Sequence, residues 1–400
     1  MRRLSLFSRR YLLVTVPLAT LRSTDVSSSF RICSRNHSIT TDRCTLEELH
    51  RSAAEFFERG DFVNAIKQWE AVMKSQGETD SPSPTLMNCL NNLACAYGEI
   101  GHQKKKLQLL ERSRDMVSKV YGNDHPQYGM VLYNMACAHE EMGNFQKMED
   151  LLLESLAIHE LKFHPKHPKV GRVLLLLTEA HGHLGKYEEQ LKVAKRAFEI
   201  VQRHCGPEHT QTTIAMLTLA RAYGANGNQA RRLQLAQQSY DIQEKKLGAM
   251  NPQIALTLIE LADSHGANGN HFHRKELLEK SIEIQKRAFG TQHTHLITTY
   301  TALGDACGEL GDKENQSFWY CEALDLARRR YKGKHIAIGT AANKCAWGLL
   351  RIGKVKEAKS LAEEAQEIFD GNVSDDHPAA IELRNTFNEL MKVTIGKESL

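Results

Sequence analysis

The stretch LNNLACAYGEIG, from Leu90 to Gly101, contains one face of a helix and the turn that follows it. Leu90, Leu93, Ala94 and Tyr97 are spaced i, i+3, i+4 and i+7, which is the apolar stripe of an amphipathic helix. Gly101 is the residue type that most often reverses the chain where a helix ends. The stretch therefore predicts a helix with one buried face and a tight turn after it.

The glycine of this stretch recurs at a fixed interval of 42 residues. Its copies are Gly143, Gly185, Gly227, Gly269, Gly311 and Gly353. A period this regular over most of 400 residues predicts a repeat architecture, in which each unit buries its apolar face against its neighbours.

A second marker with the same period is the histidine of YGNDHP, Tyr121 to Pro126. His125 is followed at 42-residue steps by His167, His209, Asn251, His293, His335 and His377. A catalytic base would be expected once, in one constellation, and not in every repeat. Because proline suits the first turn of a helix and a polar residue before it can cap that helix, we interpret this histidine as a helix start signal.

Each glycine is followed by a second periodic apolar segment. One column of that segment is expected to be buried: Leu110, Leu152, Ala194, Ala236, Leu278, Tyr320 and Ala362. Small residues recur in the first segment, where two helices must approach closely: Ala94, Ala136, Ala220, Ala262 and Ala346. Each unit is therefore predicted to be a helical hairpin.

The pattern L-x-x-L-A-x-A-Y-G-x-x-G resembles the tetratricopeptide repeat (TPR), and the 42-residue period resembles the kinesin-light-chain type of that family. The resemblance implies an all-α superhelical solenoid of about eight hairpins with a capping helix. The expected organisation is a presequence over 1–43, a short first hairpin over 45–75, a polar linker over 76–84, seven 42-residue repeats over 85–370 and a capping helix over 375–395.

The N-terminal segment has a composition unlike the rest of the chain. Residues 1–43 carry eight arginines, no lysine and two acids, which leaves 44 basic and 46 acidic residues elsewhere. Such an arginine- and serine-rich, acid-poor start predicts a mitochondrial presequence. A secretory signal in the apolar run Tyr11 to Leu21, or a tail without a targeting role, is the alternative. The nearly neutral body argues against nucleic-acid binding.

Two further composition arguments narrow the class of protein. No run of 18 apolar residues occurs, so no transmembrane helix is expected in the body. The nine cysteines are scattered, odd in number and without a C-x-x-C pair, which predicts neither a disulfide framework nor a zinc site and favours a reducing compartment.

The motifs that could carry enzymatic chemistry are better interpreted as structural. In HELKFH, His159 and His164 are five residues apart and would point about 140° away from each other on a helix, so they cannot share a metal. The cluster His265, His271 and His273 surrounds a repeat turn and is interpreted as core or interface. No P-loop, dinucleotide fingerprint or G-x-S-x-G motif occurs. The sequence predicts no enzyme, no cofactor and no metal site.

Partner-binding residues are suggested by the repeat family, in which the first helix of each hairpin lines the concave groove. The residues that the resemblance assigns to this groove are Asn91, Tyr133, Leu175, Glu179, Leu217, Arg221, Ile259, Asp263, Asp305, Asn343 and Trp347. A glycine column beside them is expected to leave the wall low. Aliphatic and acidic side chains there suit a peptide with apolar anchors and a basic side chain, although pairing of these acids with Arg221 is an open alternative.

The resulting hypothesis is a non-catalytic protein-interaction scaffold or assembly factor of mitochondria, with an unidentified protein or peptide partner. A cytoplasmic cargo adaptor like kinesin light chain is a second hypothesis, although no heptad coiled coil precedes residue 45. An RNA-binding helical-repeat protein of organelle gene expression is a third.

Overall fold

The computed structural model describes residues 39–59, 61–75, 84–331, 333–370, 372–375 and 377–398. Residues 1–38 of the expected presequence and 76–83 of the expected linker lie outside these described residues. No helix within the described part is both long enough and apolar enough to cross a bilayer.

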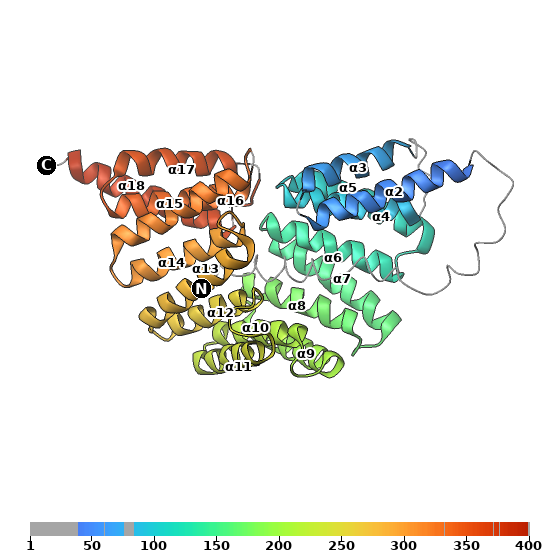
Figure 1. The fold of residues 1–400 in the computed structure, drawn as a ribbon, viewed down its shortest axis with the longest axis horizontal. Coiled ribbons are helices and arrows are strands. Elements are labelled where there is room, and N and C mark those ends of the chain that lie inside the picture. Colours follow the sequence, from blue (N-terminus) through green and yellow to red (C-terminus); the bar gives the residue numbers. More distant parts are fainter. Residues whose placement is uncertain are drawn as a thin grey trace. The chain divides into compact units, whose positions relative to one another are not determined.

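The described residues form only helices, which follow one another as antiparallel pairs (Figure 1). The first helices of the pairs are α2 (Ile39–Glu58), α4 (Pro84–Glu99), α6 (Pro126–Glu141), α8 (Pro168–His183), α10 (Thr210–Ala225), α12 (Ile254–Ala267), α14 (His295–Glu309) and α16 (Ile336–Arg351). The second helices are α3 (Phe62–Ser75), α5 (Gln103–Tyr121), α7 (Phe145–Phe163), α9 (Tyr187–Cys205), α11 (Gln229–Leu247), α13 (His271–Phe289), α15 (Lys313–Arg330) and α17 (Val355–Phe369), and α18 (Pro378–Glu398) follows them. The predicted all-α solenoid of about eight hairpins with a final helix is confirmed.

The chain divides into two compact units, with the division inside α6. The N-terminal unit contains α2 to α5 and the first part of α6, and its core surrounds the buried Trp69. The C-terminal unit begins at Ala136 and extends through α18. Most of the predicted groove belongs to the C-terminal unit.

The cores of the second to eighth hairpins contain the column that the repeat predicts. All seven residues from Leu110 to Ala362 at the 42-residue step are at most 1% exposed. The small residues Ala94, Ala136, Ala220, Ala262 and Ala346 are all 0% exposed, which lets neighbouring helices approach closely. Burial of aliphatic surface between hairpins therefore holds the array together.

The recurring histidine caps the start of a first helix, as predicted. His125, His167, His209, His293, His335 and His377 each use Nδ1 to accept a hydrogen bond from the backbone N–H two residues on. Asn251 does the same with its side-chain oxygen, at 2.9 Å from the nitrogen of Gln253. Only a neutral imidazole has a nitrogen that can accept, so this cap requires deprotonated histidine.

Several of these histidines also stack on an aromatic ring at the end of the preceding second helix. The ring pairs are Tyr121 with His125, Phe163 with His167, Phe289 with His293 and Tyr331 with His335, with centroids 3.9 to 4.7 Å apart. The stacking fixes the imidazole plane at the junction between two hairpins. The histidine thus joins consecutive repeats as well as capping one helix.

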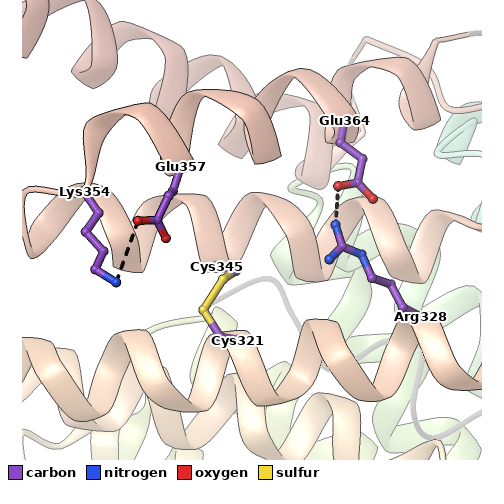
Figure 2. Close-up of a disulfide and its surroundings, with 6 residues drawn as sticks. All are labelled: Cys321, Arg328, Cys345, Lys354, Glu357 and Glu364. Atoms are coloured by element: carbon purple, nitrogen blue, oxygen red, sulfur yellow. Dashed lines mark hydrogen bonds and ion pairs between the residues drawn. A yellow bond between two sulfur atoms is a disulfide. The ribbon is translucent and has the colours of Figure 1, made fainter.

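A disulfide joins Cys321 of α15 to Cys345 of α16, with the two Cα atoms 5.0 Å apart (Figure 2). This bond corrects the prediction from cysteine spacing, which left all cysteines unpaired. The pair escapes spacing rules because its members lie on different hairpins, 24 residues apart, and meet only when the array stacks. A stable disulfide is typical of an oxidising compartment, so the expectation of a reducing one loses its basis.

Within the described residues of the C-terminal unit, segments from distant repeats also come into contact. The backbone N–H of Ser374, between α17 and α18, donates to the carbonyl of Met142 at the end of α6, at 3.0 Å. Gly143 beside it has a φ of +80°, and a Cβ there would lie 2.8 Å from the ring of His377. The corresponding glycines Gly185, Gly227, Gly269, Gly311 and Gly353 face open space.

Candidate functional site: the inner wall of the first helices

In the C-terminal unit, the first helices lie on the inner side of the array. The pairs α8 with α10, α10 with α12 and α14 with α16 come into backbone contact, and the second helices of neighbouring hairpins do so less. The layer whose helices approach more closely is the one with the smaller radius. The solvent-facing side of α8, α10, α12, α14 and α16 is therefore the candidate binding surface.

Each of these five helices presents three partly exposed positions in the same register, and we call these fifteen residues the inner wall. They are Lys169, Arg172 and Glu179; Gln211, Ile214 and Arg221; Gln253, Leu256 and Asp263; His295, Thr298 and Asp305; and Ala337, Thr340 and Trp347. Spacings of three and seven residues keep the three positions of one helix within an arc of about 80°. Each helix thus contributes one continuous stripe to the wall.

The residues assigned to the groove from sequence divide into two sets. Glu179, Arg221, Asp263, Asp305 and Trp347 belong to the inner wall. Leu175, Leu217, Ile259 and Asn343 are instead buried, at 5%, 9%, 1% and 3% exposure. In the N-terminal unit Asn91 is partly exposed and Tyr133 is buried. A partner-binding role for all of them stays a prediction.

The buried set packs toward neighbouring hairpins. Leu175, for example, belongs to a core cluster with Ile200 of α9 and Ala215 of α10. The wall positions that sequence reasoning missed are those at the start of each helix, from Lys169 to Thr340. Their signal was available, because they repeat at 42 residues and lie three or seven positions from one another.

The third wall position of each helix, occupied by Glu179, Arg221, Asp263 and Asp305, takes part in an ion-pair network between repeats. Arg221 of α10 pairs with Glu179 of α8 and lies 3.7 Å from Glu260 of α12. Arg232 of α11 approaches Glu260 to 3.0 Å. Burial alone would lower the pKa of Arg221, but the charges of Glu179 and Glu260 outweigh it and raise that pKa. Arg221 therefore remains a cation between two carboxylates.

The network continues at Asp263. Arg274 of α13 binds Asp263 at 3.0 Å and Glu309 at 2.7 Å. Burial raises the pKa of Asp263 to about 6, and the charge of Arg274 opposes that rise. Asp263 is thus a carboxylate that its surroundings hold only weakly in the charged form near neutral pH.

The C-terminal end of the network converges on Asp305. The hydroxyl of Tyr320 donates a hydrogen bond to this carboxylate, and Lys344 lies 3.5 Å from it. Lys344 also lies 3.6 Å from Glu382 of α18. The disulfide partners Cys321 and Cys345 directly follow Tyr320 and Lys344, so the disulfide tethers the two backbones that serve Asp305.

The glycine column of the first helices does not leave the wall low, which corrects the sequence prediction. A Cβ on Gly224 would lie 2.5 Å from Cδ of Arg232, and one on Gly266 would lie 2.6 Å from Cδ of Arg274. Gly98, Gly182 and Gly308 are covered in the same way, by Lys106, Gln190 and Gln316. Each glycine makes room for a long polar side chain that comes from the second helix eight residues later.

Where the glycine is missing, the long polar side chain is missing too. In the third hairpin Glu140 stands at the glycine position, and Met148 stands eight residues later, where the long polar side chain would be. In the eighth hairpin Leu350 and Ala358 occupy the same two positions. The paired choice shows that glycine is used here for close side-chain approach. In two hairpins this approach places Arg232 and Arg274 among the acids of the network.

The wall therefore consists of two bands with different electrostatics. The paired band is Glu179, Arg221, Asp263, Asp305 and Trp347, and each of its charged members forms an ion pair within the chain. The acid-free band is the other ten residues: Lys169, Arg172, Gln211, Ile214, Gln253, Leu256, His295, Thr298, Ala337 and Thr340. The acid-free band carries two cations, two glutamines and two aliphatic side chains toward its α8 to α12 end.

Two of the histidines singled out in the sequence, His265 and His273, meet edge to face with ring centroids 4.4 Å apart. His271 lies 2.7 Å from Glu309, and His273 lies 2.9 Å from Glu276 on its own helix. His159 is buried, and its Nδ1 lies 2.7 Å from the carbonyl of Ser155. Within the described residues, no group of three metal-ligating side chains is arranged to hold an ion.

Comparison with known proteins identifies the repeats. Tetratricopeptide-repeat models match residues 107–160 and 170–245, residues 86–127 and 254–295, and residues 297–330. Together these ranges cover more than half of the chain. A comparison with curated protein sequences finds no match.

Several solved structures are similar to this chain. The nearly identical TPR-like repeats of a Podosopora anserina protein assigned as a kinesin light chain are 27% identical, with 50% of this chain and 95% of that chain covered and a TM-score of 0.45. BtubC (BKLC) from P. vanneervenii is 15% identical over 58% and 94% of the two chains, with a TM-score of 0.46. RapI in its apo form is 12% identical over 72% and 98%, with a TM-score of 0.57, which supports the fold alone. From its matched repeats and their 42-residue period, the chain belongs to the tetratricopeptide-repeat family, in its kinesin-light-chain type.

Proposed function

We propose that this protein is a non-catalytic scaffold of mitochondria that holds a segment of a partner protein along the inner wall. The observation that carries this proposal is the register of the wall. Five consecutive helices repeat the same three partly exposed positions, which gives a chain lying across them a regular series of contacts. TPR arrays commonly use their concave surface in this way.

The chemistry of the wall supports binding more than catalysis. The charged groups of its paired band form ion pairs within the chain, as Arg221 does with Glu179 of the preceding hairpin. Its apolar members Ile214 and Leu256 lie at equivalent positions of neighbouring helices. A surface that combines aliphatic anchors with a network of satisfied charges suits recognition of a peptide segment.

The location in mitochondria rests on the amino-acid sequence of residues 1–43. An arginine-rich, acid-poor segment is what import into that organelle recognises. The Cys321–Cys345 disulfide favours an oxidising compartment over a reducing one. The proposal therefore places the mature protein in an oxidising compartment of the organelle.

The test is affinity capture of the C-terminally tagged protein from gently solubilised cells, followed by mass spectrometry. A wall variant, I214N/L256N, and a matched outer-surface variant on α9, K192E/K195E, are captured in parallel. We expect one set of organelle proteins to be lost with the wall variant and retained with the control. Retention of every partner by the wall variant would contradict the scaffold proposal.

The same preparation tests location through the N-terminus of the purified protein. A cleaved form starting near residues 35 to 45 is expected for an imported protein. An uncleaved protein that captures motor or vesicle components would replace this proposal with the cytoplasmic cargo-adaptor hypothesis.

A further inference from the structure

The helix α7 carries apolar side chains on the side that faces solvent. Leu153, Ala157 and Leu161 are spaced four residues apart, so they follow one line along the helix within an arc of about 80°. All three are exposed, Leu153 at 47% and Leu161 at 71%. The core of the hairpin is supplied by the opposite side of the same helix, where Leu152 and Ile158 are buried. We call Leu153, Ala157 and Leu161 the outer stripe.

The other repeats show what an ordinary outer face contains at these positions. Moved by 42 residues, the outer stripe becomes Lys195, Glu199 and Arg203 of α9, all of them exposed. The corresponding residues of α5, α11 and α13 are also exposed, and each is charged or is a glutamine. In α15 a disulfide cysteine precedes an exposed acid and an exposed arginine. These five helices all place an acid four residues before a base, which suits a solvated helix face. Of the second helices from α5 to α15, α7 alone has an apolar face there.

The end of α7 departs from the repeat as well. The helices α5, α9, α11 and α13 end at glycines whose φ lies between +80° and +87°. The helix α7 ends instead at His164 with a φ of +93°, and no other non-glycine residue of the described part has a positive φ. His164 is exposed and follows Leu161 by about one helical turn. Because such strain is typical of functional surfaces, it supports a use for the outer stripe beyond packing.

The charge along the outer stripe has one sign. From residue 150 to residue 161 the chain contains Asp150, Glu154 and Glu160 and no lysine or arginine. Glu160 forms an ion pair with Arg196 of α9. Asp150 and Glu154 are exposed, and neither forms an ion pair within the described residues. An apolar stripe with acids beside it is therefore open to a partner that carries positive charge.

We propose that the outer stripe docks a basic amphipathic helix of a partner protein. Apolar side chains of that helix would cover the stripe, and its lysines or arginines would lie beside Asp150 and Glu154. A helix fits because α7 uses its backbone hydrogen-bonding groups internally, so an extended segment could not join it as a strand. Leu153 and Leu161 are about 12 Å apart along the axis, which corresponds to about two turns of a partner helix. The outer stripe lies on a second helix, so it adds a binding surface to the inner wall of the proposed function.

The charges argue against two other occupants of the outer stripe. A second copy of this chain, with its α7 antiparallel to the first about Ala157, would bring Glu154 of each copy opposite Glu160 of the other, acid against acid. An anionic membrane would be repelled by Asp150 and Glu154, since helices that lie on such membranes are rich in lysine and arginine. A basic partner helix is the occupant that gains from these acids.

The test uses the purified full-length protein and three fluorescein-labelled peptides of about 18 residues, or five helical turns. The first has leucines on one helical face and lysines beside them, the second replaces every lysine with glutamate, and the third contains the residues of the first in scrambled order. Fluorescence anisotropy gives the affinity of each peptide at low and high salt. We expect the basic amphipathic peptide to bind at least about tenfold more tightly than either of the others, with an affinity that falls as salt rises.

Variants that copy the next repeat locate the site. L153K/A157E/L161R gives α7 the outward residues that α9 has at the same positions, and it should weaken binding of the basic peptide by about tenfold or more. D150K/E154K reverses the charge beside the stripe and should weaken binding by a similar factor. Circular dichroism melting checks that the array is intact. L153K/A157E/L161R should not lower the melting temperature, because it changes only exposed side chains.

The inner-wall variant I214N/L256N should bind the basic peptide as the wild type does, so failure of this inference is distinguishable from failure of the scaffold proposal. Four results would overturn the inference. Two are equal affinities for the basic and acidic amphipathic peptides, and unchanged binding by L153K/A157E/L161R. The third is a wild-type dimer in analytical ultracentrifugation that this variant abolishes. The fourth is binding of the wild type, but not of this variant, to vesicles of anionic phospholipid.

Discussion

The two bands of the inner wall lie on the same five helices but differ in their electrostatics. The paired band holds Glu179, Arg221 and Asp263 in partly buried positions, so each charge needs a partner inside the chain. The acid-free band carries the cations Lys169 and Arg172 and the aliphatic side chains of Ile214 and Leu256, and none of its ten members is an acid. In a repeat array, one row of positions can therefore carry the ion pairs that stabilise the stack, while the row beside it varies in polarity from one repeat to the next.

The largest expected effect tests the structural role of the paired band. Arg221→Ala should lower the free energy of unfolding by about 3 kcal/mol, because it leaves Glu179 without its cation and removes one of the two cations beside the buried Glu260. Arg172→Ala, in the acid-free band, should cost less than about 1 kcal/mol. Urea unfolding followed by circular dichroism measures both.

A surface pair supplies the baseline for that comparison. Arg328 and Glu364 form an exposed ion pair between α15 and α17 (Figure 2). Arg328→Ala should cost at most about 0.5 kcal/mol. Equal losses for Arg221→Ala and Arg328→Ala would mean that the paired band adds no more to stability than ordinary surface charges.

The disulfide should give the next largest effect. C321A/C345A is expected to lower the free energy of unfolding by about 2 to 3 kcal/mol, because the unfolded chain regains the freedom that the cross-link removes. Addition of a reductant should lower the melting temperature of the wild type and leave that of the double variant unchanged. A wild type that melts identically with and without reductant would show that the two thiols are not joined in solution.

Gly224, one of the first-helix glycines that a long side chain covers, tests how Arg232 reaches the paired band. Gly224→Ala should cost about 1 to 3 kcal/mol in wild type, since its Cβ would collide with Arg232. In the Arg232→Ala background the same change should instead stabilise by about 0.5 to 1 kcal/mol, because alanine is the better helix former. The same sign in both backgrounds would contradict the proposed contact between residues eight apart.

The smallest expected effect concerns pH. Burial lowers the pKa of His377 from its ordinary 6.5 to about 4. The folded state therefore disfavours the protonated ring, and its stability should fall as pH decreases from about 6.5 towards 4, where the unfolded chain is already protonated. His377→Asn keeps a side-chain acceptor, as Asn251 does, but cannot titrate in this range.

The measurement is the urea midpoint of unfolding as a function of pH. The decline between pH 6.5 and 4 should be shallower for His377→Asn than for wild type. His209→Asn is the matched control at an exposed cap and should change that decline less. Parallel curves for wild type and His377→Asn would mean that His377 does not contribute to the acid sensitivity.

The sequence contained most of the fold because the fold is periodic. The column from Leu110 to Ala362, the small residues such as Ala94 and the capping histidines could all be placed by counting in steps of 42. The pairing of Gly224 with Arg232 was also readable, since the same eight-residue pairing recurs and disappears together with the glycine in the third and eighth hairpins.

The candidate site was less accessible for physical reasons. Leu175 and Ile259 were assigned to the groove, but both side chains are buried, and Leu175 packs in a core cluster with the next hairpin. A difference of a few tens of degrees around the helix axis separates such buried positions from the solvent-facing ones, and the sequence does not fix that angle. The partners of Arg221 come from two other hairpins, and those of Lys344 likewise lie on other helices. Such pairs, like Cys321 with Cys345, depend on how hairpins stack, which the composition of one repeat does not determine.

The contact between Ser374 and Met142 limits how this array can evolve. Open solenoids gain or lose whole repeats easily, because each unit needs only its two neighbours. Here five complete hairpins, α8 to α17, separate the two residues that meet. Duplication or deletion of a single 42-residue unit would carry Ser374 and His377 away from Gly143. The contact therefore ties the C-terminal unit to its present number of repeats.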